Sequence, residues 1–174
     1  MVKNSSYVAL GLLVATLFVI PACDWLQRAD TQEIEKPMLR IIDVNMPEVY
    51  SDAHIESAVH VNLDELESAS KTWNKEDSLI VYCSDYKCRT SHSAARALRD
   101  LGFKDVAVYA GGISEWYKLS RENNERYPFV GAGTMPFLQK ETEKVIPEKE
   151  ELKIVSADDV ALQIEKKRGM GLAA

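Results

Sequence analysis

Short apolar runs, each bounded by polar residues, recur through the middle of the chain and predict a set of β-strands. The runs are rich in β-branched and aromatic side chains, which is the composition of buried strands. They span residues 39–44, 79–83 and 106–109, and residues 58–62 alternate like a further strand. Each run is too short for a helix of ordinary length, so we interpret all four as strands.

Segments with helical spacing lie between these runs. The clearest places Ala94, Leu98 and Leu101 on one face, and Gly102 follows as a stop signal. Shorter segments predict a turn or helix at 46–50, a helix at 63–70, and the opening of a last helix at 113–116. Because strands alternate with helices, the predicted fold class is α/β, with a parallel sheet flanked by helices on both faces.

Two cysteines, Cys83 and Cys88, bracket the loop that follows the strand at 79–83. Ligands bind at the carboxyl ends of strands in parallel sheets, and Cys83 occupies such an end. The free N–H groups and dipole of the following helix, with Lys87 and Arg89, would stabilise a thiolate. We therefore expect a lowered pKa for a nucleophilic Cys83, and we expect the same N–H groups to cradle an anionic substrate.

The N-terminal segment predicts a lipoprotein signal peptide over residues 1–22. Lys3 precedes an apolar stretch at 8–20, which has the length of a signal-peptide core and is short for a membrane span. The following Ile20-Pro21-Ala22-Cys23 resembles a lipobox, which implies cleavage before Cys23 and lipid on that residue. The alternative is an uncleaved anchor helix in which Cys23 has no role.

Residues 23–37 are polar and charged, and we interpret them as a spacer that tethers the domain to the membrane. Either interpretation of the N-terminus places the rest of the chain outside the cytoplasm, facing the periplasm or the cell exterior. Asp24, directly after the lipidated cysteine, favours the inner membrane where the sorting rule of enteric bacteria applies.

Composition adds two constraints. The chain has 174 residues, 46% of them hydrophobic, which fits one domain and a tail, and its net charge of −6 without a basic patch gives no indication of nucleic-acid binding. If Cys23 carries lipid, Cys83 and Cys88 are the remaining thiols of the three cysteines. A disulfide between them would close a small ring and constrain little of the unfolded chain, which favours a reactive pair over a structural bridge.

Five segments resemble, in order, the motifs of the rhodanese-like domain family. They are 41–50, 54–61, 81–83, 101–106 and 109–116. The resemblance implies a rhodanese-like domain over 38–130, with its active cysteine at Cys83. The chain departs from the family pattern at Asn45, where an arginine is usual, and in its loop, which has two extra residues and a second cysteine, Cys88. The second cysteine resembles a family variant with paired loop cysteines.

The resemblance implies a sulfurtransferase. Cys83 would attack the outer sulfur of a small sulfur-containing anion, thiosulfate or a polysulfide, and the resulting persulfide would pass its sulfur to a thiol acceptor. Arg89 would bind the oxyanion, and Cys88 would either resolve the persulfide or carry the sulfur itself. The other loop residues would bind substrate: Ser84, Asp85, Tyr86, Lys87, Thr90 and Ser91. This chemistry requires no metal or organic cofactor, and the three histidines are not spaced as metal ligands.

Two other functions remain open on the sequence. Cys83, five intervening residues, Arg89 and Thr90 fit the Cys-x5-Arg-Ser/Thr pattern of cysteine phosphatases. Against this, Asp85 would repel a phosphate and Cys88 would tend to form a disulfide with the nucleophile. The cysteine pair would also suit a non-catalytic thiol redox or sulfur-carrier module, although a Cys-x-x-Cys motif is absent. No prediction of oligomeric state follows from the sequence.

Residues 131–174 form a charged tail that ends in a predicted strand and helix at 152–165. Ser156 followed by Asp159 is a variant of the capping box, and Val160 and Ile164 share one helix face. The segment resembles the opening strand and helix of a rhodanese domain. We expect it either to pack on the sheet in the place of that element, as in a circular permutation, or to form a separate helix that docks on a partner.

Overall fold

The structure is a computed structural model that describes residues 36–141, 143–145 and 151–171. The predicted signal peptide at 1–22, Cys23, Asp24 and nearly all of the spacer lie outside the described residues. Within the described part, no helix combines the length and the apolar character that a membrane span needs.

The elements of the first half follow the predicted alternation of strand and helix. They are β1 (Leu39–Asp43), α1 (Pro47–Asp52), β2 (His54–Ile55), β3 (Ala58–His60), the short helical turns η2 (Leu63–Glu65), α2 (Leu66–Ala69) and η3 (Ser70–Thr72), and β4 (Ser78–Tyr82). Pro47 in the first turn favours the start of α1 there, because the first N–H groups of a helix have no carbonyl partner within the helix and proline lacks this N–H.

The second half continues this alternation and adds elements in the tail. They are α3 (Thr90–Asp100), β5 (Asp105–Tyr109), α4 (Gly112–Glu122), β6 (Phe129–Val130), the short helix η4 (Pro136–Gln139), β7 (Lys153–Val155) and α5 (Ala157–Gly171). Gly102 follows α3 with φ of 91°, the left-handed conformation that ends a helix, as the sequence predicted.

Five strands form one sheet in the order β3-β1-β4-β5-β7, and every neighbouring pair is parallel. The central strand β4 pairs with β1 and β5 along its whole length, from Ser78 to Tyr82. Its four apolar residues are fully buried, which explains the continuous apolar run. The predicted parallel α/β sheet is confirmed.

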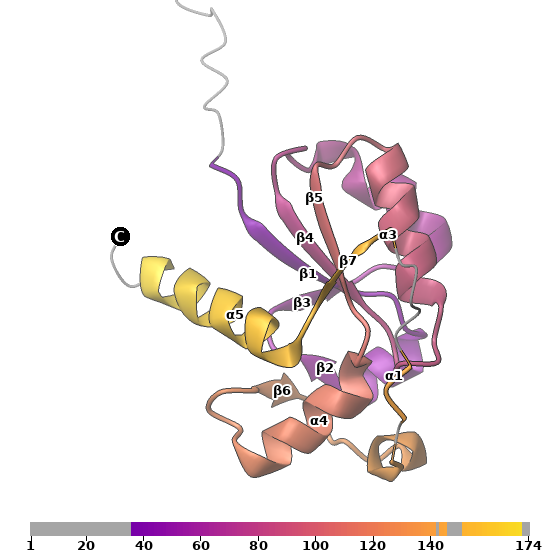
Figure 1. Ribbon diagram of the computed structural model, residues 1–174, viewed down its shortest axis with the longest axis vertical. Helices are drawn as coiled ribbons and strands as arrows, with labels where there is room; N and C mark the ends of the chain where they lie inside the picture. Colours follow the sequence, from indigo (N-terminus) through magenta and orange to yellow (C-terminus); the bar gives the residue numbers. More distant parts are fainter. Residues whose placement is uncertain (1–35, 142, 146–150, 172–174) are drawn as a thin grey trace, which may run out of the picture. The chain divides into compact units, whose positions relative to one another are not determined.

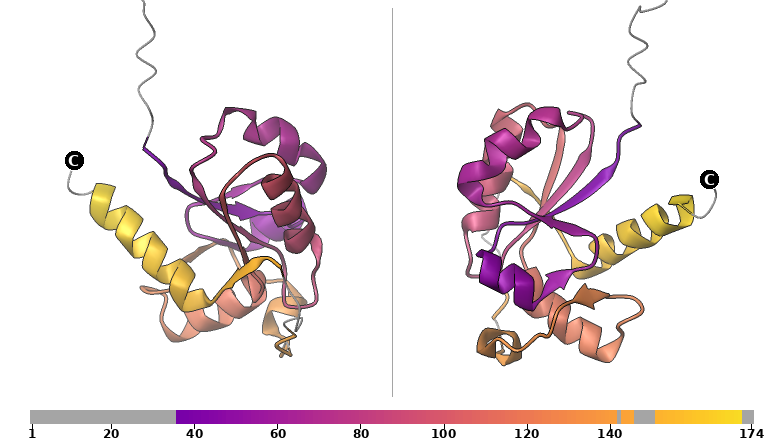
Figure 2. Two further views of the ribbon diagram at one scale, coloured as in Figure 1. Left: turned by 45° about the horizontal axis from the view of Figure 1, so that its top comes forward. Right: turned by 180° about the vertical axis from the view of Figure 1, so that it is seen from behind.

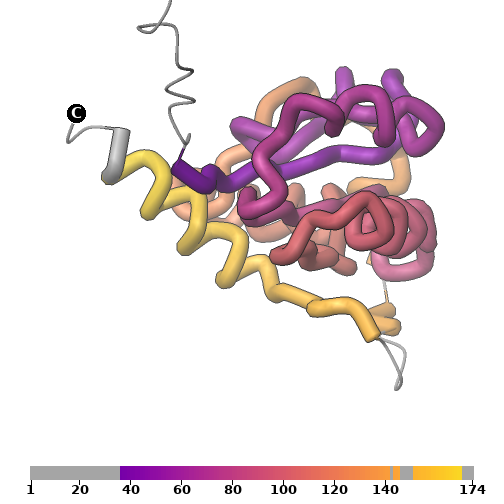
Figure 3. The backbone as a smooth tube through the Cα atoms, turned by 90° about the horizontal axis from the view of Figure 1, so that it is seen from above, coloured from indigo at the N-terminus to yellow at the C-terminus, as the bar shows by residue number. Residues whose placement is uncertain are grey.

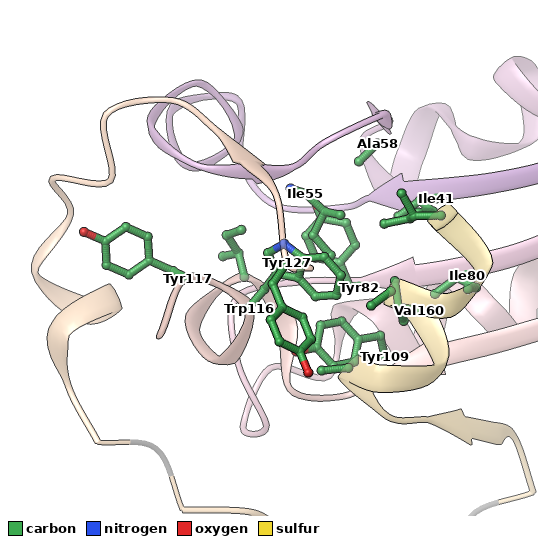
Figure 4. Packing of buried hydrophobic residues seen from close by; sticks show 14 of the residues in the cluster. Ile41, Ile55, Ala58, Ile80, Tyr82, Tyr109, Trp116, Tyr117, Tyr127 and Val160 are labelled. Carbon is green, nitrogen blue, oxygen red and sulfur yellow. The ribbon is translucent and has the colours of Figure 1, made fainter. Parts of the chain in front are cut away.

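Helices cover both faces of the sheet, as predicted (Figure 1). One face packs against α2 and α3, and its core joins Leu66 and Leu98 to alternate strand residues such as Val81 and Val108. The other face packs against α1, α4 and α5, where Trp116 lies among Tyr82, Tyr109 and Tyr127 (Figure 4). The two further directions of Figure 2 show α3 and α5 on opposite sides of the sheet.

The tail supplies the fifth strand and the helix that follows it. β7 pairs in parallel with β5, with Val155 beside Tyr109. Val160 and Ile164 of α5 are buried in the same core as Ile41 and Ile80. The two side chains would have lain far from the sheet if the tail did not pack on it. They lie against it instead.

Both ends of α5 are fixed by specific contacts. The backbone N–H and Oγ of Ser156 donate to the Asp159 carboxylate, at 2.9 and 2.7 Å, and the Asp159 N–H donates back to the serine Oγ. This reciprocal pair is the predicted capping-box variant. Toward its other end the helix passes the start of β1 (Figure 3). There Lys167 Nζ donates to the Leu39 carbonyl at 3.3 Å.

The segment between α4 and β7 folds back toward α1. β6 pairs antiparallel with β2, and the Asp52 carboxylate then accepts hydrogen bonds from the backbone N–H groups of Thr134 and Met135, each at 3.0 Å. These contacts hold η4, which begins at Pro136, next to the carboxyl end of β1. The sequence predicted a loop around this proline, and the structure has a short helix there.

Candidate active site

The loop with the paired cysteines begins at the carboxyl end of β4 and ends at the first residue of α3, Thr90. Two backbone hydrogen bonds anchor its start: the N–H groups of Ile113 and Ser114 donate to the carbonyls of Cys83 and Ser84, at 3.0 and 2.9 Å. Gly112 makes this approach possible. Its φ is 61°, and a Cβ there would lie 2.8 Å from the Asp85 nitrogen.

The Asp85 carboxylate folds back onto its own loop. Its Oδ1 accepts hydrogen bonds from the N–H groups of Lys87, at 2.9 Å, and Cys88, at 3.2 Å. These two loop N–H groups are therefore not available to an anionic substrate, because a carboxylate of the chain itself already accepts from them. An Asp side chain commonly accepts a hydrogen bond from the backbone N–H two residues later, in the arrangement called an Asx turn.

Cys88 is the cysteine of the pair whose pKa is lowered. Its sulfur accepts hydrogen bonds from Cys83, from the hydroxyl and N–H of Thr90 and from the N–H of Ser84. These donors lower the pKa of Cys88 to about 4, against the opposing effect of its partial burial. Thr90 is the first residue of α3, so the helix N-terminus acts on Cys88.

Cys83 behaves in the opposite way to the prediction. Its hydrogen bond to Cys88 and its burial raise the pKa of its thiol, because both favour the protonated form. The side chain is 2% exposed, and its Sγ lies 3.2 Å from Ser91 Oγ and 3.4 Å from the Cys88 carbonyl oxygen. The prediction of a lowered pKa for Cys83 is wrong: the hydroxyl and N–H of Ser91, in the first turn of α3, lower the pKa, but the contact with Cys88 and burial outweigh them.

A pocket of about 560 Å³ opens beside the loop, and we call it the Cys88 pocket. It combines residues that follow β1 and β3 with the cysteine loop and with Phe137 from η4. The lining residues are Val44, Asn45, Met46, Val49, Asn62, Leu63, Asp64, Ser84, Asp85, Cys88, Thr90 and Phe137. Cys88 is the cysteine among the described lining residues, so a ligand in this pocket meets the sulfur with the lowered pKa.

Comparison with known proteins identifies the family. The family profile described as "Rhodanese-like domain" matches residues 26–119, more than half of the chain. The chain belongs to the rhodanese-like domain family. The matched segment includes β1 to β5 and the whole cysteine loop, so the rhodanese resemblance found in the motifs is confirmed.

Curated relatives of this rhodanese-like chain include sulfurtransferases. Thiosulfate sulfurtransferase GlpE of Coxiella burnetii (strain RSA 331 / Henzerling II) is 34% identical over 83 residues, which cover 48% of this chain and 76% of that protein. YrkF of Bacillus subtilis (strain 168) is 34% identical over 90 residues, which cover 52% of this chain and 45% of that protein. The chain thus spans less than half the length of YrkF, and it is related to rhodanese-like sulfurtransferases at modest identity.

Solved structures of rhodanese-like proteins also match. The Escherichia coli structure titled "rhodanese with anions from E. coli" is 28% identical, with a TM-score of 0.42, and the match covers 53% of this chain and 98% of that one. Alr3790 of Anabaena sp. is 26% identical, with a TM-score of 0.47, covering 55% and 70%. Because both scores are below 0.5, we assign the fold from the sheet order and register described above.

The structure brings together four of the predicted site residues of this rhodanese loop: Ser84, Asp85, Cys88 and Thr90 line the pocket. The other five lie elsewhere. Cys83 and Ser91 are buried beside each other, Tyr86 is buried with its hydroxyl donating to Glu115 Oε1 at 2.9 Å, and Lys87 and Arg89 are exposed and outside the lining.

Several lining residues were not predicted as site residues. Asn45, Met46, Asn62, Leu63 and Asp64 directly follow the strands β1 and β3, and the rule that ligands bind at carboxyl ends of parallel strands would have found them. Phe137 gave no such signal. It lies in the tail, almost fifty residues after Cys88, and its segment is held there by Asp52 and by the burial of Leu138 in the core.

Proposed function

We propose that the chain is a sulfurtransferase that carries sulfur as a persulfide on Cys88, with Cys83 as the thiol that hydrogen-bonds to it. The observation behind this choice is the position of the two sulfurs: Cys88 lines the pocket and has the lowered pKa, whereas Cys83 is buried and has a raised pKa. The proposal keeps the sulfur-transfer reaction expected from the sequence and moves the attacking atom from Cys83 to Cys88.

The reaction takes two steps, which balance without an added oxidant. In the first, the Cys88 thiolate attacks the outer sulfur of the donor, the S–S bond of the donor breaks, and its leaving group departs with the electron pair. In the second, the thiolate of an acceptor takes that outer sulfur, and Cys88 leaves as a thiolate. The N–H groups of Ser84 and Thr90, which already donate to Cys88, would stabilise the anionic sulfur throughout.

The loop geometry does not favour the phosphatase alternative. A Cys-x5-Arg phosphatase needs the loop N–H groups free to bind a phosphate, and here Asp85 accepts two of them. Its carboxylate also lines the pocket that a phosphate would enter. The redox-module alternative uses the same two cysteines, so the experiment below distinguishes it from sulfur transfer by mass.

The proposal includes attachment to a membrane outside the cytoplasm, through lipid on Cys23. Its support is the signal-peptide pattern at 1–22 and the polar spacer at 23–37. Expression with a labelled fatty acid tests it: the label should follow the wild type into the membrane fraction, and Cys23→Ser should carry no label. A Cys23→Ser variant that is labelled as strongly as the wild type would contradict the assignment.

Intact-mass spectrometry tests the reaction. In a Cys23→Ser background, the chain is incubated with polysulfide or thiosulfate, desalted and weighed. We expect a gain of one sulfur atom that persists in Cys83→Ser and disappears in Cys88→Ser. A gain lost only in Cys83→Ser would return the role to that residue, and a loss of two hydrogens without added sulfur, reversed by reductant, would support the redox module.

A further inference from the structure

The Cys88 pocket has an unusual charge for a site that would take a small dianion. Its charged lining residues in the described part of the chain are two carboxylates, Asp64 and Asp85. Lysine and arginine are absent from that lining. The lining residue after the end of β1 is Asn45, whose amide carries no charge.

The cations of the loop do not compensate for this. Lys87 and Arg89 are the sequence neighbours of Cys88. Both side chains are exposed, and neither is among the residues that line the pocket. The loop N–H groups of Lys87 and Cys88 donate to Asp85. An incoming sulfite-like group would therefore meet carboxylates where a dianion site needs cations and free N–H donors.

Apolar side chains form much of the remaining lining. Val44, Val49 and Phe137 are buried or half-buried, and Met46 and Leu63 are 68% and 40% exposed. The latter two belong to the small set of large hydrophobic residues that are exposed in the described part of the chain, and they meet at one pocket. Exposed apolar side chains that gather at a pocket mark a contact surface for an apolar ligand.

On the basis of the sulfurtransferase function proposed above, we propose that the sulfur donor of this site is an organic persulfide whose carbon-bearing group is apolar or positively charged, in place of thiosulfate. The Cys88 thiolate attacks the terminal sulfur of the R–S–SH donor. The S–S bond of the donor breaks, R–S⁻ departs with the electron pair, and the terminal sulfur with its proton remains on Cys88. The apolar residues contact the R group, and Asp64 and Asp85 attract a cation on it.

The test compares donors of one size that differ in charge. The full chain with Cys23→Ser is treated with persulfides made from cysteamine, from 3-mercaptopropionate and from propanethiol, which are cationic, anionic and apolar, and with thiosulfate. The rate at which one sulfur atom appears on Cys88 is followed by intact mass. We expect the cationic and apolar donors to react at least about tenfold faster than the anionic one, because two carboxylates face the donor, and thiosulfate to be slowest.

Two variants connect that preference to the carboxylates. Asp64→Asn should reduce the ratio of the cationic to the anionic rate severalfold. Asp85→Asn should do the same while keeping the oxygen that accepts from Lys87 and Cys88. Glu67→Gln is the matched control, since Glu67 is an exposed carboxylate outside the pocket lining, and it should leave the ratio unchanged.

The outcomes separate this inference from the proposed function. If thiosulfate or the anionic persulfide loads Cys88 as fast as the cationic and apolar donors, the donor inference is wrong and the sulfurtransferase function stands. If no donor places sulfur on Cys88, both are wrong. If the preference is found but the two Asn variants keep it in full, the assignment to Asp64 and Asp85 is wrong.

Discussion

Removing the Cys83 thiol should raise the pKa of Cys88 by a predictable amount. The hydrogen bond from Cys83 is the largest of the contacts that bring the Cys88 pKa to about 4. A hydrogen bond to a charged group contributes about 1.5–3 kcal/mol. At 1.36 kcal/mol for each pKa unit, its loss in Cys83→Ala should raise the pKa by roughly one to two units. Cys83→Ser keeps a hydroxyl donor and should change the pKa little.

The assay is the pH dependence of alkylation. In a Cys23→Ser background, the rate of iodoacetamide addition to Cys88 is measured by mass from acid to alkaline pH. The midpoint of the profile is the informative quantity, because the intrinsic nucleophilicity of a thiolate falls with its pKa and the absolute rate mixes both effects. We expect a midpoint of about 4 for the folded wild type and, once the chain is unfolded in urea, a midpoint of about 8.5.

Two results would refute the reasoning. A folded wild-type midpoint near that of the unfolded chain would mean that Thr90, Ser84 and Cys83 do not stabilise a thiolate on Cys88. A midpoint that stays the same in Cys83→Ala would mean that Cys83 is not its main donor. Cys88→Ser supplies the control for the second thiol: Cys83 is buried and has a raised pKa, so this variant should be alkylated slowly until it unfolds.

Three further predictions follow. Persulfide formation should vary by less than about twofold from pH 6 to 8 and fall as pH drops through the lowered Cys88 pKa, since the thiolate is present above that pKa. Ile164→Ala should lower the free energy of unfolding in urea by about 2–5 kcal/mol, whereas Leu162→Ala, 46% exposed, should change it by less than about 0.5 kcal/mol. Gly112→Ala should displace the Cys83 carbonyl, lowering both the unfolding free energy and sulfur loading.

The main strands of the sheet could be predicted because the residues within each strand are enough to identify it. β4 and β5 each contain four consecutive buried apolar residues, and β1 is mainly apolar apart from Arg40 and Asp43, so each strand is recognisable from its own residues. Strand β7 differs: it has three residues, begins with an exposed lysine, and is recognisable mainly through its position before the Ser156 cap. Its place beside β5 depends on the rest of the sheet, which is why the sequence left two alternatives for the tail.

The site was predictable only in part, because its decisive contacts are not sequential. The sequence located both cysteines and the end of β4, which local patterns mark. It did not show that α3 begins at Thr90 and so directs its N-terminus at Cys88. Nor could it show that Phe137 lines the pocket, because the contacts of Asp52 with Thr134 and Met135 span more than eighty residues.

Asp85 determines how the longer loop works. A loop with extra residues exposes extra backbone N–H groups, which must find acceptors when they are partly buried. Asp85 supplies one carboxylate oxygen for two of them, and this fixes the turn that presents Cys88 to the pocket. The same carboxylate then occupies the place of a bound anion and adds negative charge beside the thiolate. Asp85 therefore positions Cys88 at the pocket, while the donors that lower the Cys88 pKa come from Cys83, Thr90 and Ser84. If the proposed donor preference is found, the residue that shapes the loop also contributes to the choice of substrate.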